Sequence, residues 1–132
     1  MHIEHVAIWV KDLEKMKAFY EKQFNVSSSE LYYNPNTQFQ SYFLTFETGS
    51  RLELMTKPFL ASRAVDIFGY AHLAIALGGK SDVDAFVEKL VSEKYPLLNG
   101  PRMTGDGYYE AVVQDPEGNL IELTTDLESF ID

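Results

Sequence analysis

Apolar and polar positions are patterned in the same way in the two halves of the chain. Residues 5–10 (HVAIWV) and residues 72–77 (HLAIAL) each show the two-residue alternation of a strand. Each strand is followed by apolar positions at helical spacing, with Asp12 as the expected N-cap of the first helix. Ser81 is the expected N-cap of the second helix, with Asp84 as its capping-box partner. The predicted apolar stripes comprise Leu13, Met16, Tyr20 and Phe24 in the first helix and Val83, Phe86, Val87, Leu90 and Val91 in the second.

Each predicted helix is followed by several predicted strands, separated by turns. Gly49 lies in one such turn, and DPEG at the start of DPEGNLIEL (115–123) forms another. The strands are expected at residues 30–33, 39–47 and 51–56 in the first half, and near Leu97, at residues 109–114 and at residues 119–125 in the second.

The second half repeats the first in sequence as well as in pattern. HVAIWV matches HLAIAL, and AFYEK matches AFVEK, both at an offset of 67 residues. TGSRLEL matches EGNLIEL at an offset of 69. The predicted fold class is therefore α+β, with two βαβββ modules in tandem. We expect a single domain over residues 1–132, made of modules 1–57 and 70–126 joined by a connector at 58–69, with residues 126–132 as a cap or a frayed end.

Composition narrows the classes of partner. The formal net charge is −9 and Lys and Arg are not clustered, which argues against nucleic acid and against an anionic membrane surface. No apolar run is long enough to span a bilayer, and the N-terminus does not resemble a signal peptide, so cytoplasmic residence is expected. The absence of cysteine excludes disulfides and thiolate ligands. A small molecule or a protein partner remains.

Two histidines and two glutamates occupy equivalent positions of the repeat: His5 with His72, and Glu53 with Glu122. Glu122 lies between two apolar residues of a predicted strand, where an unpaired carboxylate is costly to desolvate. Either Glu122 faces solvent on an edge strand or it binds a partner. Duplicated modules generally pack about a pseudo-twofold axis, which brings equivalent positions together. Two imidazoles and two carboxylates suit a divalent metal such as Zn, Ni, Co, Fe or Mn, so we predict a metal site.

These residues and motifs resemble the vicinal oxygen chelate superfamily, and glyoxalase I-like proteins in particular (the glyoxalase/bleomycin resistance/dioxygenase fold). The resemblance runs from IEHVAIWVKDLEKMKAFY to DPEGNLIEL. It implies paired modules around a U-shaped metal cleft. It also maps the His/Glu/His/Glu ligand set onto His5, Glu53, His72 and Glu122, and it implies a homodimer whose sites draw on both subunits.

The resemblance also implies a reaction. In glyoxalase I the metal polarises the oxygens of a hemithioacetal of methylglyoxal and glutathione, and a carboxylate of the ligand set moves a proton through an enediolate that the cation stabilises. Glu122 is the expected catalytic base and Glu53 its pseudo-symmetric counterpart. The expected function is a lyase or isomerase acting on a small α-oxo (hemithioacetal-type) substrate, with a divalent metal ion and a low-molecular-weight thiol as cofactors.

Two positions depart from the glyoxalase I pattern. The resemblance leads us to expect an arginine and an asparagine for the glutathione contacts, and this chain has Trp9 and Lys57 there. Dependence on glutathione is therefore doubtful, and another substrate or thiol is at least as well supported. Trp9 is either a pocket residue or a core residue. The candidate substrate-binding residues are Trp9, Arg51, Lys57, Arg102 and Tyr109.

Each of the other candidates has a plainer explanation. Arg51 could hold a substrate anion or pair with Glu53 or Glu47. Arg102 and Tyr109 lie in a glycine-bearing stretch (101–109) that either closes over the cleft or is an ordinary hairpin.

Other functions within the superfamily remain open. An Fe(II) extradiol-type dioxygenase would hold its metal with two histidines and one glutamate, and Glu53 would fill the position it needs open. A non-enzymatic antibiotic-binding protein, like the bleomycin-sequestering members, would lack the ligand set. The retained His and Glu residues therefore favour the lyase.

Overall fold

The computed structural model describes residues 1–64 and 66–126. The chain divides into two compact units, here called unit 1 (Met1–Val65) and unit 2 (Asp66–Asp132), and the division falls within the predicted connector. The tail expected at residues 126–132 lies, beyond Asp126, outside the described residues. In the described part of the chain, no helix is long and apolar enough to cross a membrane.

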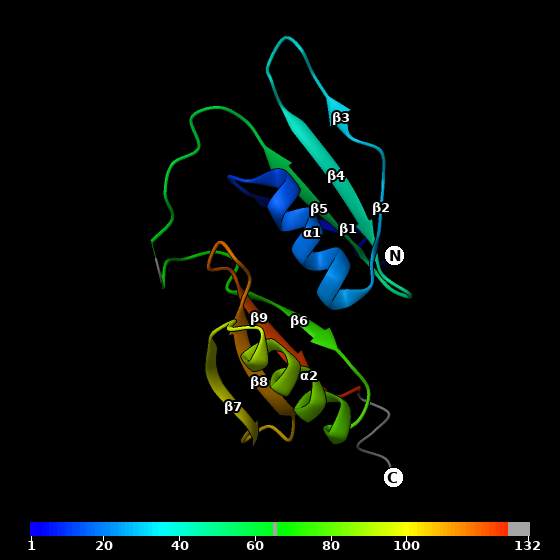
Figure 1. Cartoon of the computed structure of the whole chain (residues 1–132), viewed down its shortest axis with the longest axis vertical. Helices are drawn as coiled ribbons and strands as arrows, with labels where there is room; N and C mark the ends of the chain where they lie inside the picture. The colour runs from blue at the N-terminus through cyan, green and yellow to red at the C-terminus, as the bar shows by residue number, and fades with distance from the viewer. Residues whose placement is uncertain (65, 127–132) are drawn as a thin grey trace. The chain divides into compact units, whose positions relative to one another are not determined.

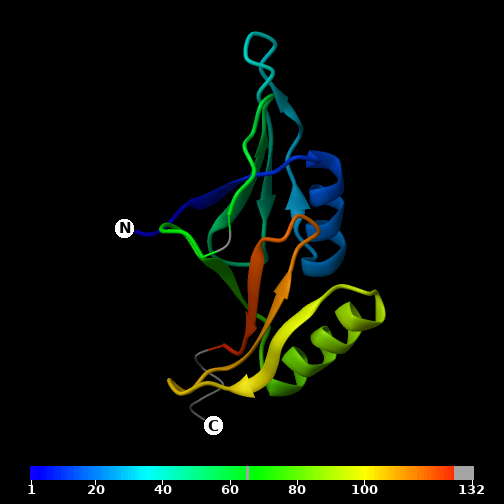
Figure 2. The ribbon, with the colours of Figure 1, turned by 90° about the vertical axis from the view of Figure 1, so that its left-hand side faces the viewer.

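Unit 1 is a mixed sheet with one helix packed on it (Figures 1 and 2). The sheet has the strand order β1-β5-β4-β2, with β3 also paired to β4. β1 and β5 are parallel, and the remaining pairs are antiparallel. Its elements in chain order are β1 (His5–Trp9), α1 (Leu13–Phe24), β2 (Ser27–Ser28), β3 (Tyr32–Tyr33), β4 (Gln40–Thr45) and β5 (Arg51–Thr56).

The predicted capping of α1 is confirmed. The Asp12 side chain accepts a hydrogen bond from the Lys15 N–H at 3.0 Å, and Asn25 ends the helix in a left-handed conformation. The apolar side of α1 packs on the sheet and forms the core of the unit. Its most deeply buried members are Val10, Met16, Tyr20, Leu44 and Leu54.

The strand predicted at residues 30–33 is shorter in the structure and is preceded by a short strand that the pattern did not reveal. β2 and β3 both pair with β4, with a gap between them. Next to that gap the Ser29 Oγ accepts the Phe43 N–H at 2.9 Å, so a side chain replaces a backbone carbonyl in the ladder.

Unit 2 repeats this arrangement with the strand order β6-β9-β8-β7, and α2 lies on one face of the sheet (Figures 1 and 2). β6 and β9 are parallel, whereas β9, β8 and β7 pair antiparallel. The α+β fold of two βαβββ-type modules is therefore confirmed. Its elements are β6 (His72–Ala76), α2 (Lys80–Ser92), β7 (Leu97–Met103), β8 (Tyr109–Gln114) and β9 (Leu120–Thr124).

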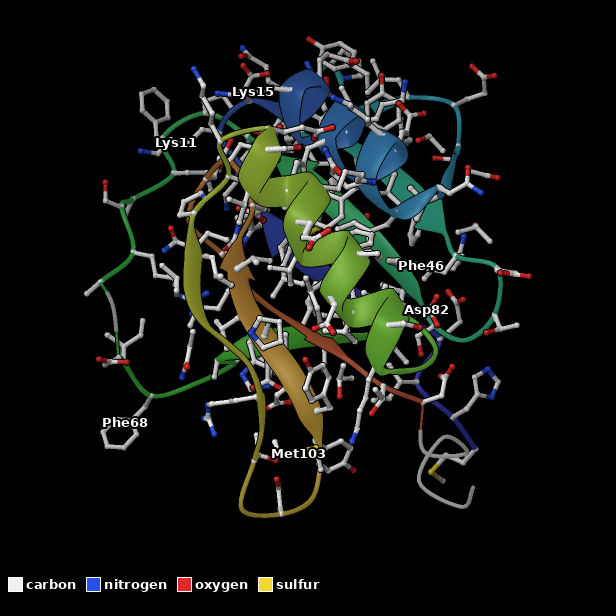
Figure 3. The ribbon with its side chains drawn as sticks, turned by 60° about the horizontal axis from the view of Figure 1, so that its bottom comes forward. Lys11, Lys15, Phe46, Phe68, Asp82 and Met103 are labelled. Carbon is white, nitrogen blue, oxygen red and sulfur yellow. The ribbon has the colours of Figure 1, made fainter. Side chains whose placement is uncertain are left out.

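The predicted start of α2 is wrong by two residues. The N-cap is Gly79 rather than Ser81, and Asp82, seen at the start of the helix in Figure 3, accepts the Gly79 N–H at 2.8 Å. Asp84 is not the predicted capping-box partner; its carboxylate accepts a hydrogen bond from the Tyr109 hydroxyl. The stripe prediction also fails at Val91, which is 49% exposed because it lies at the margin of the helix face that packs on the sheet.

A tight turn sets the register of β8 against β9. Asp115 Oδ1 accepts the Glu117 and Asn119 N–H groups at 2.9 and 3.0 Å, as the DPEG motif predicts. The pairing that results places Val112 opposite Glu122. Residues 104–108 form the hairpin loop between β7 and β8, with Thr104 N–H donating to the Tyr108 carbonyl at 2.7 Å.

Candidate functional site

Parallel pairing of β1 with β5 makes His5 and Glu53 diagonal neighbours in unit 1. In this register Ala7 is opposite Glu53 and His5 is opposite Arg51. Strand alternation sends His5 and Glu53 to the face away from α1, because the buried Leu52 occupies the helix side. His5 Nε2 lies 3.7 Å from Glu53 Oε1. The pair is therefore accessible from the open face of the sheet.

The same construction recurs in unit 2. Ala74 is opposite Glu122 in the parallel β6–β9 pair, and His72 Nε2 lies 3.1 Å from Glu122 Oε1. β9 lies between β6 and β8, so the alternative that placed Glu122 on an edge strand is wrong. Glu122 keeps 21% of its side-chain surface exposed and His72 keeps 37%. In both units a small alanine neighbours the glutamate.

The chemistry of both pairs, and the spacing of the unit 2 pair, fit a divalent metal ion. Two ligands about 2.0–2.2 Å from one ion, at tetrahedral or octahedral angles, are separated by roughly 2.8–3.6 Å. The unit 2 pair, at 3.1 Å, lies within that range, and the unit 1 pair, at 3.7 Å, is slightly wider. Within residues 1–64 and 66–126, no group of three or more His, Cys, Asp or Glu could hold a metal ion. Each unit by itself thus offers two of the four expected ligands, and the joint site stays a prediction.

Arg51 forms its ion pair with a carboxylate that the sequence analysis had not considered. Its guanidinium donates from Nε to Glu4 Oε2 at 2.9 Å and from Nη2 to Glu4 Oε1, rather than pairing with Glu53 or Glu47. Glu4 Oε1 also lies 3.1 Å from His5 Nδ1. Hydrogen bonding from Arg51 lowers the pKa of Glu4 to about 2, so Glu4 is a carboxylate throughout the physiological range.

A second carboxyl shares the open face of unit 2 with Glu122. Glu110 on β8 pairs with Thr124 of β9, one step from the Val112–Glu122 pair. Burial raises the pKa of Glu110, and the charge of Glu122 and a hydrogen bond with it raise that pKa further. The positive charge of Arg102 lowers the pKa of Glu110. Glu110 therefore binds a proton more readily than an isolated glutamate does.

Trp9 and Lys57 lie together in unit 1. Trp9 ends β1 on the same face as His5 and is 46% exposed, so the alternative that placed it in the core is wrong. The Lys57 ammonium lies 4.6 Å from the centre of the Trp9 ring, and Phe39 packs edge-on against that ring at 6.1 Å. The two residues that replace the expected glutathione contacts thus form one aromatic and cationic surface. Their role in substrate binding stays a prediction.

The structure does not bring Arg102 and Tyr109 to the same face. Arg102 is exposed, pairs with Glu110 across β7 and β8, and donates to Asn99 Oδ1 at 3.3 Å. The Tyr109 hydroxyl donates to Asp84 of α2, so Tyr109 points to the helix-covered side of the sheet. Arg102 therefore neighbours the face that carries Glu122, and Tyr109 does not.

Sequence reasoning missed Glu4 and Glu110. The signal for Glu110 was present, since the DPEG turn pairs residue 112 with residue 122 and alternation then aims Glu110 to the face of Glu122. Glu4 precedes the first strand, where no pattern indicates a direction. Its contact with Arg51 depends on the parallel pairing of β1 and β5, which sequence alternation does not specify.

Two sheet-and-helix units, each with a His–Glu pair on its open sheet face, define a duplicated fold of the vicinal oxygen chelate type. The chain belongs to the Glyoxalase/Bleomycin resistance protein/Dioxygenase superfamily, whose family model matches residues 2–123. The resemblance seen in the sequence is thereby confirmed.

Solved structures of similar fold include several glyoxalases. The trypanothione-dependent glyoxalase I of Leishmania major is 24% identical, with a TM-score of 0.80 over 99% of this chain and 91% of that chain. Glyoxalase I from Zea mays is 23% identical, with a TM-score of 0.78 over 95% of this chain and 44% of that chain. A lactoylglutathione lyase from Agrobacterium tumefaciens is 23% identical, with a TM-score of 0.67 over 93% and 92%. At these identities the likeness shows the fold alone. No functionally curated protein matches the chain.

Proposed function

We propose that the protein is a metal-dependent lyase or isomerase of the glyoxalase I type, acting on a small α-oxo substrate such as a hemithioacetal. One observation carries the proposal: each unit pairs a histidine Nε2 with a glutamate Oε1 at the same strand register, at 3.7 and 3.1 Å. Presence of the same pair at equivalent positions of both units supports two matching halves of one metal site.

His5, Glu53, His72 and Glu122 are the residues that would hold the ion. When bound, a divalent cation stabilises negative charge that develops on the substrate oxygens. The protein's own part is to move the proton. Glu122 takes it from one substrate carbon, and the same carboxyl, or Glu53, returns it to the neighbouring carbon.

The surroundings of the two glutamates favour Glu122 as the base. Glu122 lies beside Glu110, whose pKa is raised by burial and then by the charge of Glu122, so a second carboxyl that takes up a proton readily adjoins it. Near Glu53 the charged neighbour is instead Arg51, whose pKa is raised by its hydrogen bond to Glu4 and, less strongly, by the charge of Glu53. The two carboxylates are equivalent in position but differ in electrostatic environment.

Trp9 and Lys57 bear on which thiol the substrate contains. Trp9 and Lys57 offer an indole face and an ammonium group where an arginine and an asparagine would be expected in glyoxalase I. The similar Leishmania enzyme is described as dependent on trypanothione, so the thiol differs among proteins of this fold. We expect weak turnover of the glutathione hemithioacetal and better turnover with another thiol or a different α-oxo substrate.

The proposal is tested by metal analysis and kinetics on the same samples. Protein purified without chelator should carry a divalent metal, and removing that metal with EDTA should abolish turnover of a panel of methylglyoxal–thiol adducts until metal is restored. His72→Ala should lower metal affinity sharply, because each histidine is one of few protein ligands. Unchanged affinity in His72→Ala would refute the ligand assignment. Metal binding without turnover of any adduct would indicate a binding protein instead.

We further propose that the protein is a homodimer in which each site takes one His–Glu pair from each subunit. The test uses two inactive parents: His5→Ala, which damages the unit 1 pair, and His72→Ala, which damages the unit 2 pair. Mixed dimers would contain one site with both intact pairs, so refolding the variants together should restore about a quarter of the parent activity if dimers form at random. If both pairs of a site came from one subunit, mixing would restore nothing.

A further inference from the structure

His5 is held from both sides of its ring in unit 1. Its Nε2 faces Glu53 Oε1 at 3.7 Å, and its Nδ1 lies 3.1 Å from Glu4 Oε1. Glu4 is fixed in turn by the two side-chain bonds from Arg51, and the Arg51 backbone N–H donates to the Glu4 carbonyl at 2.9 Å. The guanidinium also lies 4.2 Å from the centre of the Phe43 ring, which packs edge-on against His5 at 5.1 Å.

These contacts dictate where the proton of a neutral His5 resides. A carboxylate only accepts hydrogen bonds, so the ring nitrogen facing Glu4 must be the donor. With Nδ1 protonated, the lone pair of the neutral ring is on Nε2, on the side of Glu53. Only a nitrogen with a free lone pair can bind a metal ion.

The second half of the chain lacks this support. At the repeat offsets of 67 and 69 residues, Ala71 stands in the place of Glu4 and Leu120 in the place of Arg51. In the described residues, Glu122 is the one polar partner recorded for the His72 ring, and it contacts Nε2. The support is therefore a property of unit 1 and not a by-product of the duplicated fold.

We propose that Glu4 and Arg51 are positioning residues that hold His5 in the Nδ1–H tautomer, with Nε2 free to bind the metal. The metal part of this inference rests on the proposed function, whereas the tautomer part does not. Carboxylates that fix a metal-binding histidine in this way are worth about 10- to 100-fold in metal affinity.

The test compares the full-length protein with variants that copy unit 2. Glu4→Ala and Arg51→Leu introduce the residues found at 71 and 120, and Glu4→Gln keeps an oxygen that can accept from Nδ1–H. Glu47→Ala is the matched control, because it removes one exposed glutamate of unit 1 that has no recorded side-chain partner in the described residues. The tautomer of His5 is read by ¹⁵N NMR of the metal-free protein, with the signals identified by their loss in His5→Gln. Zn²⁺ affinity is measured by calorimetry.

The parent should show a protonated Nδ1 and a free Nε2 at His5. Glu4→Ala should lose that preference and bind Zn²⁺ about 10- to 100-fold more weakly than Glu47→Ala, with Arg51→Leu in between and Glu4→Gln close to the parent. An unchanged His5 tautomer in Glu4→Ala, or Zn²⁺ affinity equal to that of Glu47→Ala, would overturn the inference. If the parent bound no Zn²⁺, the proposed function would fail, and the NMR result alone would decide whether Glu4 fixes the ring.

Discussion

Replacing Glu122 by glutamine would separate the two roles that we propose for it, metal binding and proton transfer. The amide keeps the size of the side chain and leaves one oxygen for the metal, but it removes the basic carboxylate. Glu53→Gln is the matched control, because Glu53 has the same place in the register of unit 1 and the same change removes the same charge.

The expected difference between the two variants is the contribution of a positioned general base. Each variant loses one negative charge beside a histidine Nε2, so metal affinity should fall modestly and by similar amounts in both. Glu122→Gln also removes the proposed base, and loss of a positioned general base costs about 10²- to 10⁴-fold in rate, or roughly 3–5 kcal/mol. The kcat of Glu122→Gln should therefore fall by on the order of a hundredfold or more, and that of Glu53→Gln by much less.

The assay is steady-state turnover of the best methylglyoxal–thiol adduct by the parent and both variants, with metal content determined on every sample. Saturating metal is added to each, so that a difference in occupancy does not pass for a difference in chemistry. The informative quantity is the ratio of the two kcat values at full occupancy, since the effect of the lost charge on metal binding then cancels.

Full activity of Glu122→Gln at full metal occupancy would refute its assignment as the base. Equal losses in both variants would mean that the carboxylates share the proton transfer, and a larger loss in Glu53→Gln would assign the base to unit 1. Efficient turnover of the glutathione adduct by the parent would remove the doubt that Trp9 and Lys57 raise.

Two further predictions concern stability. Burial and the charge of Glu122 raise the pKa of Glu110, so the ionised form of Glu110 destabilises the fold above the ordinary pKa of a glutamate. The Glu110→Gln variant of chelator-treated protein should therefore melt at a higher temperature than the parent at neutral pH. This gain should vanish in acid, where the Glu110 carboxyl of the parent is protonated. A gain that persisted unchanged in acid would contradict this cause. Leu54 is fully buried in unit 1, so Leu54→Ala should lower the free energy of unfolding in urea by about 2–5 kcal/mol. Leu31 is 44% exposed, so Leu31→Ala should lower it by under about 0.5 kcal/mol.

Sequence patterning predicted the fold well where periodicity and capping agreed. The alternation at the start of each half corresponds to β1 and β6, and Asp12 caps α1 as expected. The errors arose where local chemistry overrides a pattern. Ser81 is a good capping residue by type, yet Gly79 is the N-cap of α2, and Asp82 accepts a hydrogen bond from its N–H. The split between β2 and β3 depends on a serine hydroxyl that enters the ladder, which no hydrophobic pattern encodes.

The repeat was also the strongest guide to the candidate site. Two consistent offsets identified the histidines and glutamates that lie at 3.7 and 3.1 Å within their units. It did not predict side-chain direction outside the strands. Phe68 projects from the connector in Figure 3, and its relative exposure is 106%. The repeat also did not predict the ion pair of Arg51, at the start of β5, which is made with Glu4 rather than with Glu47 or Glu53.

The two halves have kept the same donor atoms and acquired different neighbours. In unit 1 the carboxylate partner of the histidine is Glu4, which is charged at all working pH values and held by Arg51. In unit 2 the added carboxyl, Glu110, lies beside the glutamate rather than the histidine. A carboxylate behind a histidine makes it a fixed ligand, whereas one beside a glutamate makes proton uptake easier. Under the proposed function, unit 1 would therefore hold the ion and unit 2 would move the proton, although both units offer the same two types of donor.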